Sequence, residues 1–139
     1  MPVTYPETLA ELHLDGTPVV LLASDRLLPR LPLYVFTLRA APGVRGLRAR
    51  VAAHLLLWQD GDGYRQACAA YRLAGHRDRP LGPRQAAWGA LLCQQLTHWV
   101  GAWLAQAGWQ YQAASGAAAG RWLPGSGKRE RVDGEKSGE

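Results

Sequence analysis

The stretch LRARVAAHLLLWQDGDGYRQACAAYRLA, residues 47–74, decides the fold of this chain. It holds two long runs, residues 47–59 and 64–74, on either side of an Asp-Gly-Asp-Gly sequence. Ala and Leu are good helix formers, so two helices are one interpretation. The glycine-rich centre and the alternation of arginine with apolar residues at 47–51 favour a long β-hairpin instead.

The apolar pattern also predicts the register of this hairpin. A three-residue loop, residues 61–63, with Gly63 as a left-handed bulge residue, pairs Asp60 with Tyr64. A two-residue loop would place Gln66 and Arg72 among apolar residues of the other strand, at the cost of burying polar groups. We therefore predict the three-residue loop.

The flanking sequence predicts a second hairpin and a helix. Asp15-Gly16 is a two-residue turn signal between strands at 11–14 and 17–24, and residues 33–39 form a further strand. Pro83 suits the first position of a helix that runs to about residue 107, with Gly108 as its C-terminal cap. One face of this helix carries an apolar stripe, formed by Trp88, Leu92, Leu96, Trp99 and Trp103.

These elements predict an α+β fold. An antiparallel five-stranded sheet, two hairpins plus a central strand, is covered on one face by one long C-terminal helix. Residues 1–124 form the single domain, and residues 125–139 form a disordered tail. Because the sheet has exposed edges and a small domain gains burial by pairing, we also expect a homo-oligomer, most simply a homodimer.

Length and composition restrict the class of protein. A chain of 139 residues, 47% of them hydrophobic, supports one globular domain. No apolar run approaches the roughly 18 residues that span a membrane, and the first residues lack the pattern of a secretory signal. Two cysteines, Cys68 and Cys93, are too few to staple a secreted scaffold. We expect a cytoplasmic protein with no membrane association.

Positive charge is concentrated in the middle of the chain. Residues 26–84 hold eleven arginines and three aspartates, a net charge of +8, whereas residues 1–25 carry −4 and the tail sums to zero. Arginine presents a planar fork that suits phosphate and can stack on bases. A basic folded segment can therefore be a shaped site for a polyanion, although codon bias alone would also favour arginine over lysine.

In the predicted register, one face of the hairpin combines arginine with aromatic side chains. Proteins hold single strands in this way, with guanidinium groups on phosphates and rings stacked on bases. We predict binding of single-stranded DNA or RNA with weak sequence preference. The predicted site, which includes part of a second basic cluster ahead of the helix, consists of Arg48, Arg50, Arg72, Trp58, Tyr64, Gln66, His54, Arg77 and Arg79.

Two other interpretations of that face stay open. In the first, the face is the solvated outer surface of a sheet that is covered on one side only, where arginine and tyrosine are common strand residues. Alternatively, it is the contact of a protein-interaction or assembly module, in which Leu56, Trp58 and Cys68 bury against a partner chain.

The chain carries no motif of an enzyme, a metal site or a cofactor site. His54 and Cys68 would lie diagonally on one face, but no orienting carboxylate or oxyanion loop accompanies them. Cys93 and His98 are five residues apart, which is not the spacing that brings two metal ligands together on a helix. Asp-Gly-Asp-Gly opens like a calcium loop but lacks the distal glutamate. We predict a non-enzymatic protein without a cofactor.

Overall fold

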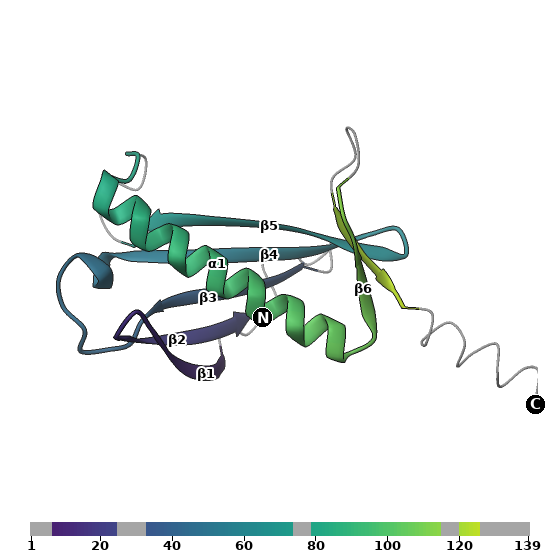
Figure 1. Cartoon of the computed structure of the whole chain (residues 1–139), viewed down its shortest axis with the longest axis horizontal. Coiled ribbons are helices and arrows are strands. Elements are labelled where there is room, and N and C mark those ends of the chain that lie inside the picture. Colours follow the sequence, from purple (N-terminus) through teal and green to yellow (C-terminus); the bar gives the residue numbers. More distant parts are fainter. Residues whose placement is uncertain (1–6, 25–32, 74–78, 115–119, 126–139) are drawn as a thin grey trace, which may run out of the picture.

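The fold is one antiparallel sheet with a single helix on one face (Figure 1). The structure is a computed structural model, and it describes residues 7–24, 33–73, 79–114 and 120–125. The strand order is β1-β2-β3-β4-β5-β7-β6. The strands are β1 (Glu7–Leu14), β2 (Thr17–Ser24), β3 (Leu33–Ala40), β4 (Val51–Asp60), β5 (Gly63–Arg72), β6 (Trp109–Gln112) and β7 (Arg121–Pro124). A 3₁₀ turn, η1, spans Leu47–Arg50, and helix α1 spans Pro83–Gln106.

The predicted α+β class, an antiparallel sheet with one helix, is confirmed, but the predicted number of strands is wrong. The sheet has seven strands rather than five, because β6 and β7 follow the helix and extend the sheet beyond β5. Each of these strands is only four residues long. The sequence of β7 carries no alternation of apolar and polar residues, and the alternation of aromatic residues and glutamine in β6 covers only four positions, too few to distinguish a strand from a loop. The helix is therefore not the last element of the fold.

The first hairpin forms at the turn that the sequence predicts. Leu14 pairs with Thr17, and the two turn residues, Asp15 and Gly16, have φ angles of 49° and 77°. Positive φ at both central residues is the requirement of a type I′ turn, which Asp-Gly satisfies well. A β-bulge between Thr8 and Ala10 interrupts the ladder between β1 and β2.

Helix α1 begins and ends close to the predicted residues. Pro83 lies in the first turn, Ala107 is the C-cap, and Gly108 has a φ of 97°, which suits a residue without Cβ. The buried residues of the helix are Trp88, Gly89, Leu92, Leu96, Val100 and Leu104. The predicted stripe is thus correct through Trp99, which is partly buried against the core, whereas Trp103 is 44% exposed and meets the Phe36 ring in an edge-type contact.

The core lies between α1 and the sheet. Its buried side chains alternate along β2, β3 and β4, as expected of a sheet with one covered face; from the sheet they include Val19, Leu21, Phe36, Leu38, Val51, Ala53, Leu55 and Leu57. From the last hairpin, Trp122 joins them at 7% exposure. None of the helices among the described residues is long and apolar enough to cross a membrane.

The predicted register of the long hairpin is wrong. Asp60 pairs with Gly63, Leu55 with Cys68 and Val51 with Arg72, so the loop has two residues, Gly61 and Asp62. Gly61 has a φ of 66°, and glycine at the first central position is the signature of a type II′ turn. The strand also starts later than expected, because residues 47–50 form η1.

Candidate nucleic-acid interface

The observed register divides the predicted binding face between the two sides of the sheet. A shift by one residue turns every side chain of a strand to the opposite face. Tyr64, Gln66 and Arg72 therefore lie on the side that α1 covers, since they pair with the core-facing positions of β4. His54 and Trp58 lie on the opposite side. The predicted combination of these five side chains on one surface is wrong.

The polar side chains on the helix side find partners that are remote in sequence. Trp122 Nε1 donates a hydrogen bond to Gln66 Oε1 at 2.9 Å, and Arg72 Nη2 donates to the Pro80 carbonyl at 3.1 Å. Because a satisfied buried polar group costs far less than an orphaned one, these bonds remove the objection to the two-residue loop. The Arg72 Nε atom stays buried without a partner among the described residues, as do Trp88 Nε1 and Arg121 Nε.

Arg48 is held by contacts within the protein. Its guanidinium lies 4.2 Å from the centroid of the Trp88 ring. Nη1 donates to Thr17 Oγ1 at 2.7 Å and to the Asp15 carbonyl at 2.8 Å, and Nη2 pairs with Asp15 Oδ2 at 2.6 Å. Arg48 therefore ties η1 to the first hairpin and to α1, and most of its donors are already in use.

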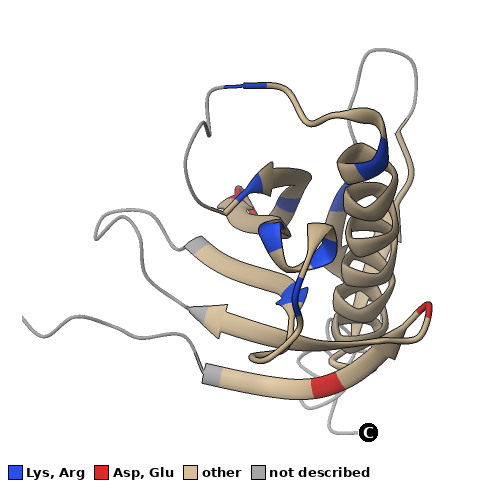
Figure 2. Cartoon of the chain, turned by 90° about the vertical axis from the view of Figure 1, so that its left-hand side faces the viewer, with Lys and Arg blue, Asp and Glu red and all other residues tan. Residues whose placement is uncertain are grey.

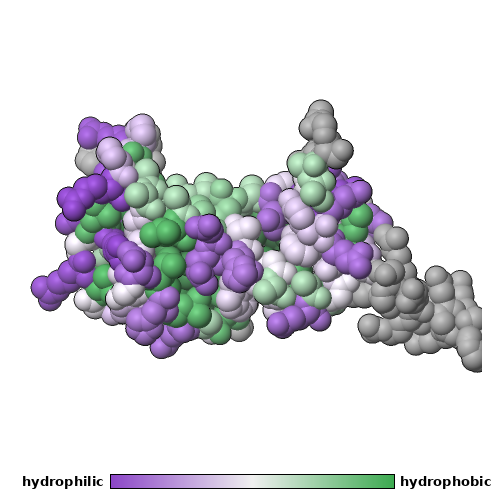
Figure 3. Space-filling view, in the orientation of Figure 1, coloured by the Kyte–Doolittle hydropathy of each residue, from purple (hydrophilic) through white to green (hydrophobic). Residues whose placement is uncertain are grey.

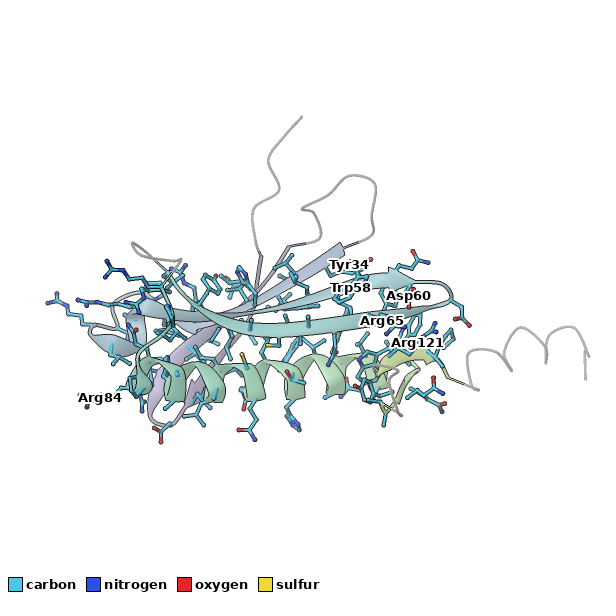
Figure 4. All side chains as sticks on the ribbon, turned by 90° about the horizontal axis from the view of Figure 1, so that it is seen from above. Tyr34, Trp58, Asp60, Arg65, Arg84 and Arg121 are labelled. Carbon is cyan, nitrogen blue, oxygen red and sulfur yellow. The ribbon has the colours of Figure 1, made fainter. Side chains whose placement is uncertain are left out.

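The predicted stacking residues lie apart from most of the arginines. Tyr64 packs edge-on against Trp109 at a centroid distance of 5.2 Å, and desolvation, assisted by Tyr34, raises the pKa of Tyr64. Trp58 lies near the β4–β5 turn, together with Asp60 and Arg65, at the end of the molecule opposite to Arg84 (Figure 4). His54 Nε2 is 2.6 Å from the Tyr71 hydroxyl oxygen.

The side of the sheet away from α1, which we call the open face, is largely apolar. Its cross-strand rows include Arg39–Ala52–Tyr71 and Thr37–His54–Ala69. Further along the strands are Val35, Leu56 and Ala67, and then Trp58 with Arg65. Leu56 and Trp58 are half-buried. This face carries an arginine at each end and, between them, mostly aromatic or apolar side chains together with Thr37.

Most of the described arginines gather at one end of the molecule, where α1 begins (Figure 2). Seven of the nine lie there, and we call this the arginine end; its members are Arg39, Arg45, Arg48, Arg50, Arg72, Arg79 and Arg84. Arg48, Arg50, Arg72 and Arg79 belong to the predicted site, whereas Arg77 lies outside the described residues. The remaining members could have been found from the excess of arginine over acidic residues at 39–84. That excess does not depend on how the strands pair.

Five members of the arginine end have no acid partner. Arg39, Arg45, Arg50, Arg79 and Arg84 are exposed and make no hydrogen bond or ion pair with the described residues. The opposite end differs, because Arg65 pairs with Asp60 and Arg121 with Asp62 there. The hydrogen bond from Arg65 holds the pKa of Asp60 below its ordinary value. Among the residues that the structure describes, arginines without an acid partner are thus confined to one end.

A cavity of about 500 Å³ opens at the arginine end. It lies between the 44–48 segment, the start of β2 and the first turns of α1. Arg45, Arg48 and Arg84 contribute to its lining, beside Trp88 and Leu91. The arginine end is therefore concave as well as positively charged. A cavity is not expected on a surface whose arginines only contact solvent.

Two thiols meet between β5 and α1. Cys68 and Cys93 are free and half-buried, and the Cys68 thiol donates to the Cys93 backbone carbonyl, with 3.9 Å between Sγ and the oxygen. The interaction of the Cys68 side chain with the Cys93 thiol lowers the pKa of Cys68 to about 7, and the same interaction raises the pKa of Cys93. His54 lies on the other face of the sheet from Cys68, so the two do not form a nucleophile and base. The described residues contain no cluster of three or more metal-ligating side chains.

Comparison of the chain with protein families, with curated proteins and with solved structures found no match.

Proposed function

We propose that this protein binds single-stranded nucleic acid, without catalysis, through the arginine end. The observation that carries the proposal is the group of five exposed arginines that lack acid partners. Exposed charges of one sign repel each other, and a phosphate backbone offers the compensating charge. Arginine also binds phosphate oxygens in a bidentate manner, which lysine does not.

An aromatic ring beside the arginine end supports a single strand as the ligand. Arg39 and Tyr71 lie in one cross-strand row of the open face, separated by Ala52, whose side chain is small. A base splayed from a single strand can stack on such a ring while its phosphate meets the guanidinium. Trp58 lies six residues further along β4, about 20 Å away, so only a strand of several nucleotides would reach it.

The proposal changes the roles of the predicted residues. Arg50 and Arg79, with Arg39, supply phosphate contacts in it. Arg48 positions η1, which also carries Arg50, because its donors bind Asp15 and Thr17. Gln66 and Tyr64 take no part, since both pack on the helix side. Weak sequence preference follows, because none of the proposed contacts reads the edge of a base.

The test is fluorescence anisotropy of labelled oligothymidylate over a series of salt concentrations. The affinity is expected to fall steeply with salt, and Arg50→Gln should reduce the slope of the logarithmic plot by about 1. Arg65→Gln is the matched control, since it removes the same charge at the opposite end. Absence of binding at low salt, or an equal effect of the two variants, would contradict the proposal.

The open face favours a second candidate, assembly with another copy of this chain. Leu56 and Trp58 on this face are half-buried rather than exposed, with Val35 and the small Ala67 beside Leu56. A homodimer that buries this face would gain apolar contact area, as small domains commonly do. Light scattering over a wide range of protein concentration tests this candidate, and a monomer at every concentration would exclude it.

A further inference from the structure

The cavity at the arginine end is built from three separate parts of the chain. Arg45 belongs to the loop before η1, Arg48 to η1 itself, and Arg84 to the first turn of α1. Arg48 is fixed by its bonds to the first hairpin, whereas Arg45 and Arg84 have no partner among the described residues. One side of the cavity is therefore preorganised, and two further guanidinium groups are free to close on a ligand.

The polar groups around the cavity are almost all donors. Trp88 lines the cavity and is 3% exposed, and its indole N–H is buried without an acceptor among the described residues, so that it adds no acceptor to the lining. Helix α1 starts with Gly82 as an N-cap that offers no side-chain acceptor, and its first turn has no acidic residue. The uncapped N–H groups add partial positive charge. Such a lining fits an anion with several acceptor oxygens.

The charge of the lining distinguishes between kinds of phosphate. Three arginines and the single aspartate bonded to one of them, Asp15, leave a net charge of +2. A phosphate monoester carries about −1.5 to −2 at pH 7, whereas each diester within a strand carries one negative charge. The lining therefore matches a terminal phosphate more closely than an internal one.

The remaining walls of the cavity are apolar. Val44, Leu47 and Leu91 lie beside the arginines, and hydrophilic and hydrophobic side chains stand next to one another over this end of the molecule (Figure 3). Its volume of about 500 Å³ falls within the range of roughly 300–1,000 Å³ of small-molecule sites. Phosphate beside an apolar wall is the combination that a nucleotide requires, since its sugar and base are less polar than its phosphate.

We propose that this cavity binds the terminal phosphate monoester of a nucleic-acid strand, with the adjoining nucleoside against its apolar wall. The protein would then engage strands preferentially at a phosphorylated end. This inference rests on the proposed function, because it names which part of the single strand the arginine end holds most tightly.

The experiment compares three forms of one short oligothymidylate: with a 5′-phosphate, with a 3′-phosphate, and with hydroxyl groups at both ends. The fluorophore is attached at the end opposite to the phosphate, and each phosphorylated form has an unphosphorylated partner with the same label position. One phosphorylated form is expected to bind about tenfold more tightly than its partner, which is the effect of one or two additional charge-assisted hydrogen bonds. The end that confers the preference identifies the polarity of the bound strand.

Variants locate the effect in the cavity. Arg45→Gln and Arg84→Gln should each reduce the preference for the phosphorylated form towards equality, and both should fold, because neither side chain has a partner among the described residues. Arg39→Gln removes the same charge at the same end but outside the lining. It should weaken every form by a similar factor and leave the preference unchanged.

Several results would overturn this inference. Equal binding of all three forms to the unaltered protein would exclude a terminal-phosphate site and leave the proposed function standing. A preference that survives in both Arg45→Gln and Arg84→Gln would exclude this cavity. If the protein binds thymidine monophosphate but no oligonucleotide, the proposed function is rejected, and recognition of a strand end is rejected with it. If it binds neither thymidine monophosphate nor any oligonucleotide, the proposal that the cavity binds phosphate is rejected as well.

Discussion

Arg48 joins three parts of the molecule that are distant in sequence. It lies over the Trp88 ring of α1, donates to Thr17 at the start of β2, and pairs with Asp15 in the first turn. The ion pair is solvent-exposed on the Asp15 side, where the side chain is 62% accessible, and such pairs contribute little. The contacts with Trp88 and Thr17 are more shielded and carry most of the stabilisation.

We therefore expect Arg48→Ala to lower the free energy of unfolding by about 2 kcal/mol, through the lost cation–π contact and the lost hydrogen bond. Asp15→Asn should lower it by less than about 0.5 kcal/mol, since asparagine tolerates the positive φ of this turn. Urea denaturation followed by circular dichroism measures both values. Equal losses in the two variants would assign the stabilisation to the ion pair instead.

The thiol of Cys68 should react at lower pH than an ordinary cysteine. The hydrogen bond from Cys93 stabilises its thiolate and lowers its pKa to about 7, so alkylation by iodoacetamide should rise through this pH. Cys93→Ala removes the donor, and the pH profile should move towards higher pH. Alkylation rates at Cys68, followed by mass spectrometry of its peptide, provide the measurement; an unmoved profile in Cys93→Ala would contradict the assigned cause.

At the scale of elements, helix α1 approaches the sheet most closely at one glycine. A Cβ atom on Gly89 would lie 2.5 Å from the Cβ of Ala70 on β5, which is shorter than real contacts allow. Gly101, nearer the C-terminal end of the same helix, would place a Cβ at 3.6 Å from the Trp122 ring, an ordinary contact. The two glycines thus serve different purposes, although both lie within one helix.

These distances predict opposite effects of the same substitution. Gly89→Ala should destabilise the fold by about 1–2 kcal/mol, because overpacking exceeds the gain of about 1 kcal/mol in helix propensity. Gly101→Ala should keep that gain and stabilise the protein. Thermal denaturation of both variants is the measurement, and stabilisation by Gly89→Ala would indicate that α1 lies further from β5.

Elements encoded by local chemistry could be predicted, and pairing that depends on distant partners could not. Asp15-Gly16, Pro83 and Gly108 signal a turn and the two ends of a helix within a few residues. The register of β4 and β5 instead depends on whether Gln66 and Arg72 find partners, and these come from Trp122 and Pro80. The sequence around Gln66 does not indicate that its hydrogen-bond donor is the indole of Trp122, 56 positions away.

At the scale of the whole molecule, the two ends differ in charge, and neighbouring strands differ in how many residues they pair. The arginine end has five arginines without a partner in the described part of the chain, while at the opposite end Arg65 pairs with Asp60 and Arg121 with Asp62. The excess of arginine in the middle of the sequence therefore predicted a basic surface, but not its position. That position follows from η1 and the start of α1, which bring Arg45, Arg48 and Arg84 to one cavity.

The extent of backbone pairing between neighbouring strands also changes across the sheet. Strands β4 and β5 pair along their whole length, whereas β5 and β7 share a single pair, Tyr64 with Trp122. We expect amide hydrogens of β6 and β7 to exchange well before those of β4, because the last hairpin can open without disturbing the central ladder. Hydrogen exchange resolved by residue tests this, and equal protection of β4 and β7 would show a single cooperative unit.

The bulge in β1 affects how this protein behaves when it is concentrated. β1 is one edge of the sheet, and a regular edge strand would offer its free N–H and C=O groups as a template for a strand of another molecule. The irregular pairing between Thr8 and Ala10 distorts that template near its beginning. We therefore expect β1 to resist edge-to-edge growth into extended aggregates more strongly than a regular edge strand would.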